Sequence, residues 1–235
     1  MKNIQRPTSN IQHPTKRRSE SRPAWRPNVG RWMLDVGRWM LLLPVLATCS
    51  LAAGLPPCCR TPLAAGKPTD RSLYQLESTW TSDIGRKVKL SVLRGRPQIL
   101  AMFFSHCEYA CPILVNDMKK LEAALPKDVL AKVDFVLVSF DTKRDTPDAL
   151  AAFRKKENLP FASWTLLRGE ADDVREFAAL LGVNYAADSR GQFAHSNLIT
   201  LLNAEGEIAF QQSGLGQNTA ALIAAITAAA AKAAR

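Results

Sequence analysis

The chain has 235 residues, which is room for one domain of ordinary size plus extensions. Its formal net charge of +10 would suit a protein that binds nucleic acid or a membrane. Most of this charge lies in residues 1–70, which hold 11 Lys and Arg against 3 Asp and Glu. Residues 71–235 hold 20 Lys and Arg against 18 Asp and Glu. The second part is therefore nearly neutral. Its basic residues lie among acids on predicted helices, as on a solvated helix face, so we expect no nucleic-acid partner.

Residues 1–38 form a basic tail. Two seven-residue sequences in and just after it are each followed directly by a near-identical copy. The copies lie at residues 3–9 and 10–16, and at residues 29–35 and 36–42. They lack the apolar positions of a coiled coil and are too short to stack as a solenoid. We expect that this tail is translated upstream DNA and that the true start is Met33 or Met40.

Residues 39–55 are uncharged and apolar, and they follow the basic residues Arg31 and Arg38. A positive segment before an apolar one is typical of an export signal. With Pro44 inside it, this segment is at the short limit for a membrane-spanning helix, so a signal peptide and an anchor are both open. The sequence around Cys49 also resembles a bacterial lipoprotein box. We expect the domain to lie on the periplasmic side of the bacterial inner membrane, either anchored or soluble after cleavage.

A linker rich in Pro, Ala and Gly follows at residues 56–72, and it contains Cys58 and Cys59, for which the sequence indicates no role. The folded domain is predicted over residues 73–235. Strands are expected at residues 88–92, 98–104, 133–140 and 164–167, and in a hairpin of residues 197–202 and 207–212. Helices are expected at residues 112–124, 147–158, 171–181 and 218–234. This order indicates an α/β thioredoxin-like sandwich, in which helices flank a central mixed sheet.

These boundaries rest on local patterns. Residues 98–104 and 133–140 are nearly continuous apolar runs, as in strands covered on both faces, whereas residues 88–92 alternate as in an edge strand. Residues with known preferences for helix ends mark three helices: Pro112, Thr146, Pro147 and Gly182. One face of the first helix is predicted to be apolar through Ile113, Leu114, Met118, Leu121 and Leu125.

Cys107 and Cys111 lie where the strand of residues 98–104 turns into the helix that Pro112 begins. Thiols at a helix N-terminus are stabilised as thiolates, so we expect both sulfur atoms to be acidic and reactive. The alternative is a structural disulfide of an exported protein. A structural disulfide is less favoured, because it would join residues that the backbone already holds together.

His195 precedes the predicted strand at residues 197–202, at the position of a thioredoxin-like fold that faces the cysteine pair. Thioredoxin-type oxidoreductases have a proline there and a C-x-x-C motif. This chain has no proline after Pro160, and one more residue separates its cysteines, which leaves room for a metal ion. Most lone histidines are structural, but this position favours a ligand. His13 lies in the tail, and His106 is expected to point elsewhere.

Two thiolates and an imidazole suit Cu(I), or Cu(II) if an oxygen joins, and zinc would also fit.

Three sequences in this order resemble motifs of the Sco/SenC family: residues 104–112, which contain C-x-x-x-C-P, residues 139–147, which contain D-x-x-R-D-T-P, and His195-Ser196. The resemblance spans residues 73–230. It implies a membrane-associated, thioredoxin-like protein that binds one copper per chain and helps to mature the copper site of cytochrome c oxidase. It also implies that Cys107, Cys111 and His195 are the ligands. Ala194 departs from the family, which usually has Asp there.

Two functions remain open at this point. A copper chaperone would hand its ion to the copper-site subunit of the oxidase, and would exchange copper with other exported carriers. A thiol–disulfide reductase would use Cys107 and Cys111 as redox thiols to keep a partner's copper ligands reduced. Asp141 follows the strand of residues 133–140. It either accepts a hydrogen bond from a ligand of the metal, or is a turn residue or a partner of Arg144.

Overall fold

The computed structural model describes residue 57 and residues 68–233. The tail at residues 1–38, the apolar segment at residues 39–55, and Cys58 and Cys59 lie outside the described residues, so the predictions made for them stay predictions. In the part of the chain that the structure describes, no helix is both long and apolar enough to cross a membrane.

A seven-stranded mixed sheet forms the centre of the domain, in the order β2-β1-β5-β4-β3-β8-β9. The strands are β1 (Trp80–Ser82), β2 (Lys87–Val88), β3 (Gln98–Phe103), β4 (Asp134–Ser139), β5 (Trp164–Arg168), β8 (Leu198–Leu202) and β9 (Ile208–Ser213). The pairs β3–β4 and β4–β5 are parallel, and the other pairs are antiparallel. A separate antiparallel pair consists of β6 (Tyr185–Ala187) and β7 (Phe193–His195).

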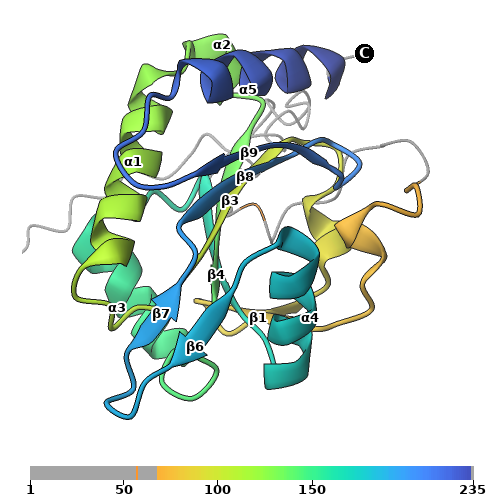
Figure 1. The fold of residues 1–235 in the computed structure, drawn as a ribbon. Coiled ribbons are helices and arrows are strands. Elements are labelled where there is room, and N and C mark those ends of the chain that lie inside the picture. The colour runs from red at the N-terminus through yellow and green to blue at the C-terminus, as the bar shows by residue number, and fades with distance from the viewer. Residues whose placement is uncertain (1–56, 58–67, 234–235) are drawn as a thin grey trace, which may run out of the picture. The chain divides into compact units, whose positions relative to one another are not determined.

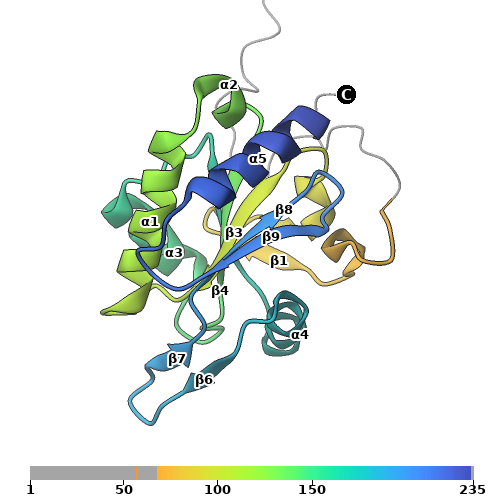
Figure 2. The ribbon, with the colours of Figure 1, turned by 45° about the horizontal axis from the view of Figure 1, so that its top comes forward.

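Helices cover both faces of this sheet. They are α1 (Ala110–Ala124), α2 (Lys127–Leu130), α3 (Pro147–Glu157), α4 (Ala171–Leu181) and α5 (Ala220–Ala233). Figures 1 and 2 show α1 and α3 on one side of the sheet and α4 on the other, while α5 lies over β8 and β9 next to α2. Every residue of β3 and β4 is buried, as their apolar sequences predict for central parallel strands. The predicted sandwich is thus confirmed.

Several helix ends follow the predicted signals. Thr146 accepts a hydrogen bond from the backbone N–H of Ala149 at 3.2 Å, and Pro147 is the first residue of α3. Gly182 ends α4 with φ +70°, a left-handed conformation that glycine adopts without steric cost. The hairpin of β8 and β9 also lies where it was predicted.

The edge strand predicted at residues 88–92 is wrong. Strand β2 ends at Val88, and residues Leu90–Leu93 form a 3₁₀ turn. The alternation of apolar and polar residues stops at Leu90. Leu90 and Leu93 lie three residues apart and share the buried side of the 3₁₀ turn. Helix α1 also begins at Ala110, two residues before Pro112, and Ile113 is 46% exposed rather than part of the buried face.

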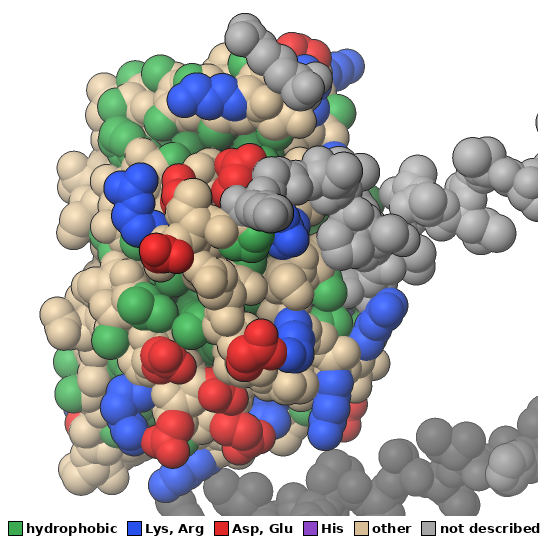
Figure 3. All heavy atoms as spheres, turned by 90° about the vertical axis from the view of Figure 1, so that its right-hand side faces the viewer, with side chains coloured by type: hydrophobic (Ala, Val, Ile, Leu, Met, Phe, Trp, Pro, Cys, Tyr) green, Lys and Arg blue, Asp and Glu red, His purple; other side chains and the backbone are tan. Residues whose placement is uncertain are grey.

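Charged side chains on the folded part are mixed in sign. Figure 3 shows one face, on which acidic and basic side chains lie close to one another, with apolar side chains beside them. This mixture is expected for a segment whose net charge is close to zero.

Among the described residues, Arg154 and Asp83 form an ion pair that is buried inside the domain. The guanidinium of Arg154, on α3, lies 2.5 Å from a carboxylate oxygen of Asp83, and both side chains are almost fully buried. Arg154 also donates to the backbone oxygens of Trp164 at 3.0 Å and of Leu159 at 3.3 Å. The pair therefore joins α3 to β5 and to the turn after β1.

We expect Arg154→Met to destabilise the domain by about 3–5 kcal/mol, because it leaves the carboxylate of Asp83 buried without a partner. Urea unfolding measures this change. Arg175→Met is the control, since Arg175 pairs with Asp172 on the surface of α4 and its loss should change stability little. Equal unfolding midpoints for the two variants would contradict the expectation.

Candidate metal centre

The two cysteines lie on a turn between β3 and α1. The backbone N–H of Cys107 donates to the carbonyl of Phe104 at 3.3 Å, which begins this turn. Because α1 starts at Ala110, Cys111 lies in its first turn, and its N–H is directed at the sulfur of Cys107 at 3.3 Å. Cys111 is fully buried, Cys107 is half-buried, and both are free thiols.

His195 reaches the cysteines from the last residue of β7. Its Nε2 lies 3.5 Å from the sulfur of Cys111, and its Nδ1 lies 3.1 Å from the carbonyl oxygen of Ser196. A carbonyl only accepts hydrogen bonds, so this contact favours the neutral tautomer with its proton on Nδ1, in which the lone pair of Nε2 can bind a metal. The ring packs against Phe140, with ring centroids 5.1 Å apart.

The sulfur atoms of Cys107 and Cys111 and a ring nitrogen of His195 lie within 4.8 Å of one another. Metal bonds to sulfur and nitrogen are about 2.0–2.3 Å long, so small side-chain rotations would bring all three atoms to one ion. The structure thus brings together the three residues that the sequence singled out, from segments 84 residues apart.

The expectation that both thiols are acidic is wrong for Cys111. Burial raises the pKa of the Cys111 thiol, and the nearby Cys107 and Asp145 raise it further. The reason is that α1 starts early and turns this sulfur into the core, where the cost of desolvating a thiolate exceeds the stabilisation by the helix N-terminus. A bound cation would reverse this balance, because a coordinating thiol loses its proton to the ion's charge.

Asp145 holds the segment that leads to Cys107, a role that the sequence did not reveal. Its carboxylate is fully buried and accepts hydrogen bonds from the backbone N–H of Ser105 at 3.0 Å and from the hydroxyls of Ser105 and Ser139, each at 2.5 Å. Nδ1 of His106 lies 3.5 Å from the same carboxylate. His106 thus lies with Asp145, apart from the group of Cys107, Cys111 and His195.

Asp141 makes the contacts of a turn residue. Its side chain is buried and accepts hydrogen bonds from the backbone N–H groups of Lys143 at 3.3 Å and Arg144 at 3.1 Å. It also forms an ion pair with the guanidinium of Arg144. These are the contacts of the second role that the sequence left open.

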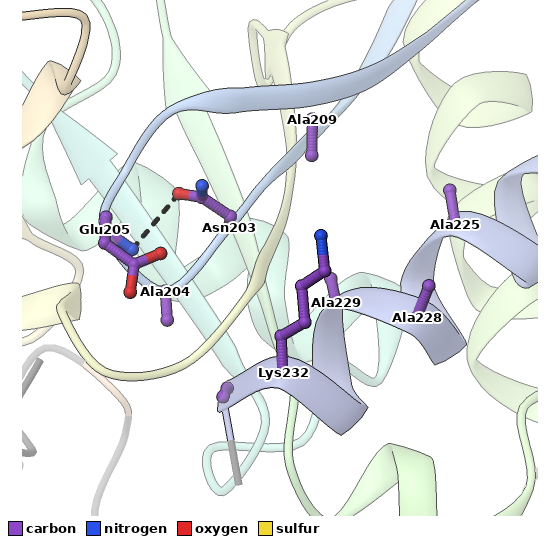
Figure 4. A pocket seen from close by; sticks show the side chains of 9 residues that line it. Asn203, Ala204, Glu205, Ala209, Ala225, Ala228, Ala229 and Lys232 are labelled. Atoms are coloured by element: carbon purple, nitrogen blue, oxygen red, sulfur yellow. Dashed lines mark hydrogen bonds between the residues drawn. The ribbon is translucent and has the colours of Figure 1, made fainter. Parts of the chain in front are cut away.

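A hollow of about 270 Å³ lies at the other end of β8, between the β8–β9 turn and α5. Figure 4 shows that its lining is mostly alanine, with Glu205, Asn203 and Lys232 as the polar residues. It contains no cysteine or histidine, so soft ligands gather only at the other end of the described domain, near His195.

The fold and this cluster define a thioredoxin-like domain with a candidate site for a soft metal ion. Residues 67–231 match the sequence profile described as SCO1/SenC, and the chain belongs to the SCO1/SenC family.

Two curated relatives show how far the similarity extends. A protein of Stutzerimonas stutzeri that is named for copper binding is 26% identical over 145 residues, which are 60% of this chain and 69% of the relative. The SCO2-like protein RC0895 of Rickettsia conorii is 28% identical over 49% of this chain and 57% of its own length. The matched part thus spans little more than half of the Rickettsia relative.

Solved structures share the fold. A SCO1/SenC family lipoprotein from Bacillus anthracis superposes with a TM-score of 0.60 at 24% identity, covering 73% of this chain and 100% of that one. Bradyrhizobium japonicum ScoI, solved with copper bound, gives a TM-score of 0.52 at 22% identity, covering 67% and 96%.

Proposed function

We propose that this protein is a copper chaperone that binds one copper ion per chain through Cys107, Cys111 and His195. It delivers the ion to the copper-site subunit of cytochrome c oxidase, or helps to assemble that site. The observation that carries the proposal is the convergence of two thiols and one imidazole within 4.8 Å at the edge of a thioredoxin-like domain.

Copper is favoured over zinc by the chemistry of the ligands and by the relatives. Two sulfur ligands suit Cu(I), and the imidazole, with an added oxygen, lets the site hold Cu(II) as well. A relative named for copper binding and a family structure with copper bound support the same ion. Zinc would take the three ligands with water as a fourth.

The unequal exposure of the three side chains suits an ion that is passed on to a partner. Cys111 lies inside the core, whereas Cys107 and His195 are only partly buried and can be reached from solvent. A partner's ligands can therefore replace the imidazole and the outer sulfur in turn, while Cys111 holds the ion until transfer is complete.

A thiol–disulfide reductase is the second candidate, because the same two thiols differ in accessibility. Half-buried Cys107 would attack a partner's disulfide and buried Cys111 would resolve the mixed disulfide. The two functions are compatible, since loss of copper frees the dithiol.

The surrounding organisation is also part of the proposal. Residues 39–55 act as a signal peptide or membrane anchor, and residues 56–72 link it to the domain at residues 73–235. The domain then works on the periplasmic side of the inner membrane, where other exported copper carriers can supply it. A related lipoprotein in the same family supports this location.

Metal analysis in graded redox buffers tests the proposal. The reduced chain should carry one copper, and copper should be lost in step with formation of a Cys107–Cys111 disulfide, because only the thiolates bind. Mass spectrometry measures both quantities in one sample. Copper that stays bound to a fully disulfide-linked chain would contradict the assigned ligands.

A further inference from the structure

The strands that carry His195 form a sheet of their own. Within residues 68–233, β6 pairs only with β7, so no ladder of hydrogen bonds joins this hairpin to the seven-stranded sheet. A bond from the N–H of Ser196 to the carbonyl of Asn184 closes the hairpin at its base. Two residues separate His195 from β8, which anchors one end of the hairpin, and side-chain contacts with the rest of the domain hold its other end. Figures 1 and 2 show the hairpin near the start of α1.

Aromatic packing joins part of this hairpin to the domain. The ring of Phe193 lies 5.1 Å from those of Phe104 and Phe140, and Tyr185 stacks on Phe140. Beside these rings, a cavity of about 590 Å³ separates the hairpin from the loop between β4 and α3. A ligand carried on such an element needs a further contact to hold it in place.

Arg144, in the loop between β4 and α3, spans this gap. Its Nε donates to the carboxylate of Asp141, and its Nη2 donates to the backbone carbonyl of Gly191 in the turn between β6 and β7. The guanidinium also lies 5.9 Å from the ring centroid of Phe104 and 6.0 Å from that of Phe193. One side chain thus contacts the loop, the end of β3 and the hairpin.

The hairpin turn is shaped for this contact. Gly191 has φ +74°, and a Cβ atom at this position would lie 3.0 Å from Nη1 of Arg144. Glycine therefore permits both the left-handed backbone and the close approach of the guanidinium. Asp141 fixes the other side of the guanidinium, so the side chain has little freedom to turn away.

We propose that Arg144 is a positioning residue, which holds the β6–β7 hairpin so that the His195 imidazole faces the two sulfur atoms. The proposal rests on the proposed copper site and assigns the D-x-x-R-D-T-P sequence a task within it. Asp145 fixes the segment that leads to Cys107, and the adjacent Arg144 fixes the element that carries His195. The loop between β4 and α3 thereby aligns both halves of the site.

Arg144→Met tests the role, because methionine keeps much of the apolar volume and removes the hydrogen bonds. We expect its affinity for Cu(II) to fall about 10-fold to 100-fold, as when a metal ligand loses its supporting partner. Affinity for Cu(I) should change far less, since two thiolates hold that ion. In a His195→Ala background, Arg144→Met should cause no further loss of Cu(II), because the imidazole it positions is already gone.

Arg190→Met is the matched control. Arg190 precedes Gly191 in the same turn, but it is exposed, and among the described residues its side chain pairs only with Asp188, so its loss should leave Cu(II) affinity unchanged.

Hydrogen exchange supplies a readout that needs no copper. Arg144→Met should speed exchange of the backbone amides of β6 and β7 and leave those of β3, β4 and β8 protected. Unchanged exchange in the hairpin, or a Cu(II) loss that adds to that of His195→Ala, would overturn the positioning role. A wild-type chain that binds no copper while its variant still loosens the hairpin would instead overturn the copper site alone.

Discussion

Replacement of both Cys107 and Cys111 by serine should abolish binding of the one copper ion per chain. An imidazole alone cannot hold Cu(I), and a serine hydroxyl is a poor ligand for a soft ion. Metal analysis of the reduced chain after gel filtration measures the loss. Because Cys111 is buried in the core, a buried serine hydroxyl could destabilise the domain. The alanine pair, which buries no new polar group, should lose copper equally.

The chain offers a matched control for this experiment. Cys58 and Cys59 are two further thiols in the same sequence. Their replacement by serine removes the same number of sulfur atoms and should leave the copper content at one per chain. If wild type and the Cys107→Ser/Cys111→Ser variant retained equal copper, the assigned ligands would be wrong.

His195→Ala should separate the chaperone from the reductase. In a chaperone, ligand exchange begins when the imidazole swings away while the sulfur atoms keep the ion. A chain without the imidazole cannot take this step, so His195→Ala should cripple delivery of copper to an oxidase copper-site domain. Cu(II) binding should weaken more than Cu(I) binding, because two thiolates hold Cu(I) in a near-linear arrangement. Reduction of the acceptor's disulfide should continue at a similar rate, since that reaction needs only the two sulfur atoms.

His106→Ala is the control for this variant. His106 lies near Cys107 in sequence, but its ring faces Asp145, so delivery should persist without it. Normal delivery by His195→Ala, together with rapid disulfide turnover by the wild-type chain, would favour the reductase instead.

The central strands and most helices could be predicted because their signals are local. The apolar sequences of β3 and β4 and the Thr146-Pro147 start of α3 depend on few neighbours. The pair β6–β7 could not be predicted, because each strand has only three residues, all of them partly or fully exposed, and shows no apolar periodicity.

The candidate ligands could be predicted from residue type and fold position, whereas their surroundings could not. The raised pKa of the Cys111 thiol depends on how deeply the first turn of α1 lies in the core. The tasks of Asp145 and Arg144 depend on Ser105 and Gly191, which lie 40 and 47 residues away in the sequence and meet them only in the folded chain.

The wide separation of the candidate ligands links copper to the stability of the folded chain. Cys111 and His195 meet only when β8 lies beside β3 and the loop after β4 is in place, so an unfolded chain has no preformed site. An ion that binds only the native state stabilises it, by about 2.7 kcal/mol at a free concentration one hundred times its Kd. The copper-loaded chain would therefore resist unfolding and proteolysis better than the empty one, and under the proposed function each delivery would return the chain to its more vulnerable form.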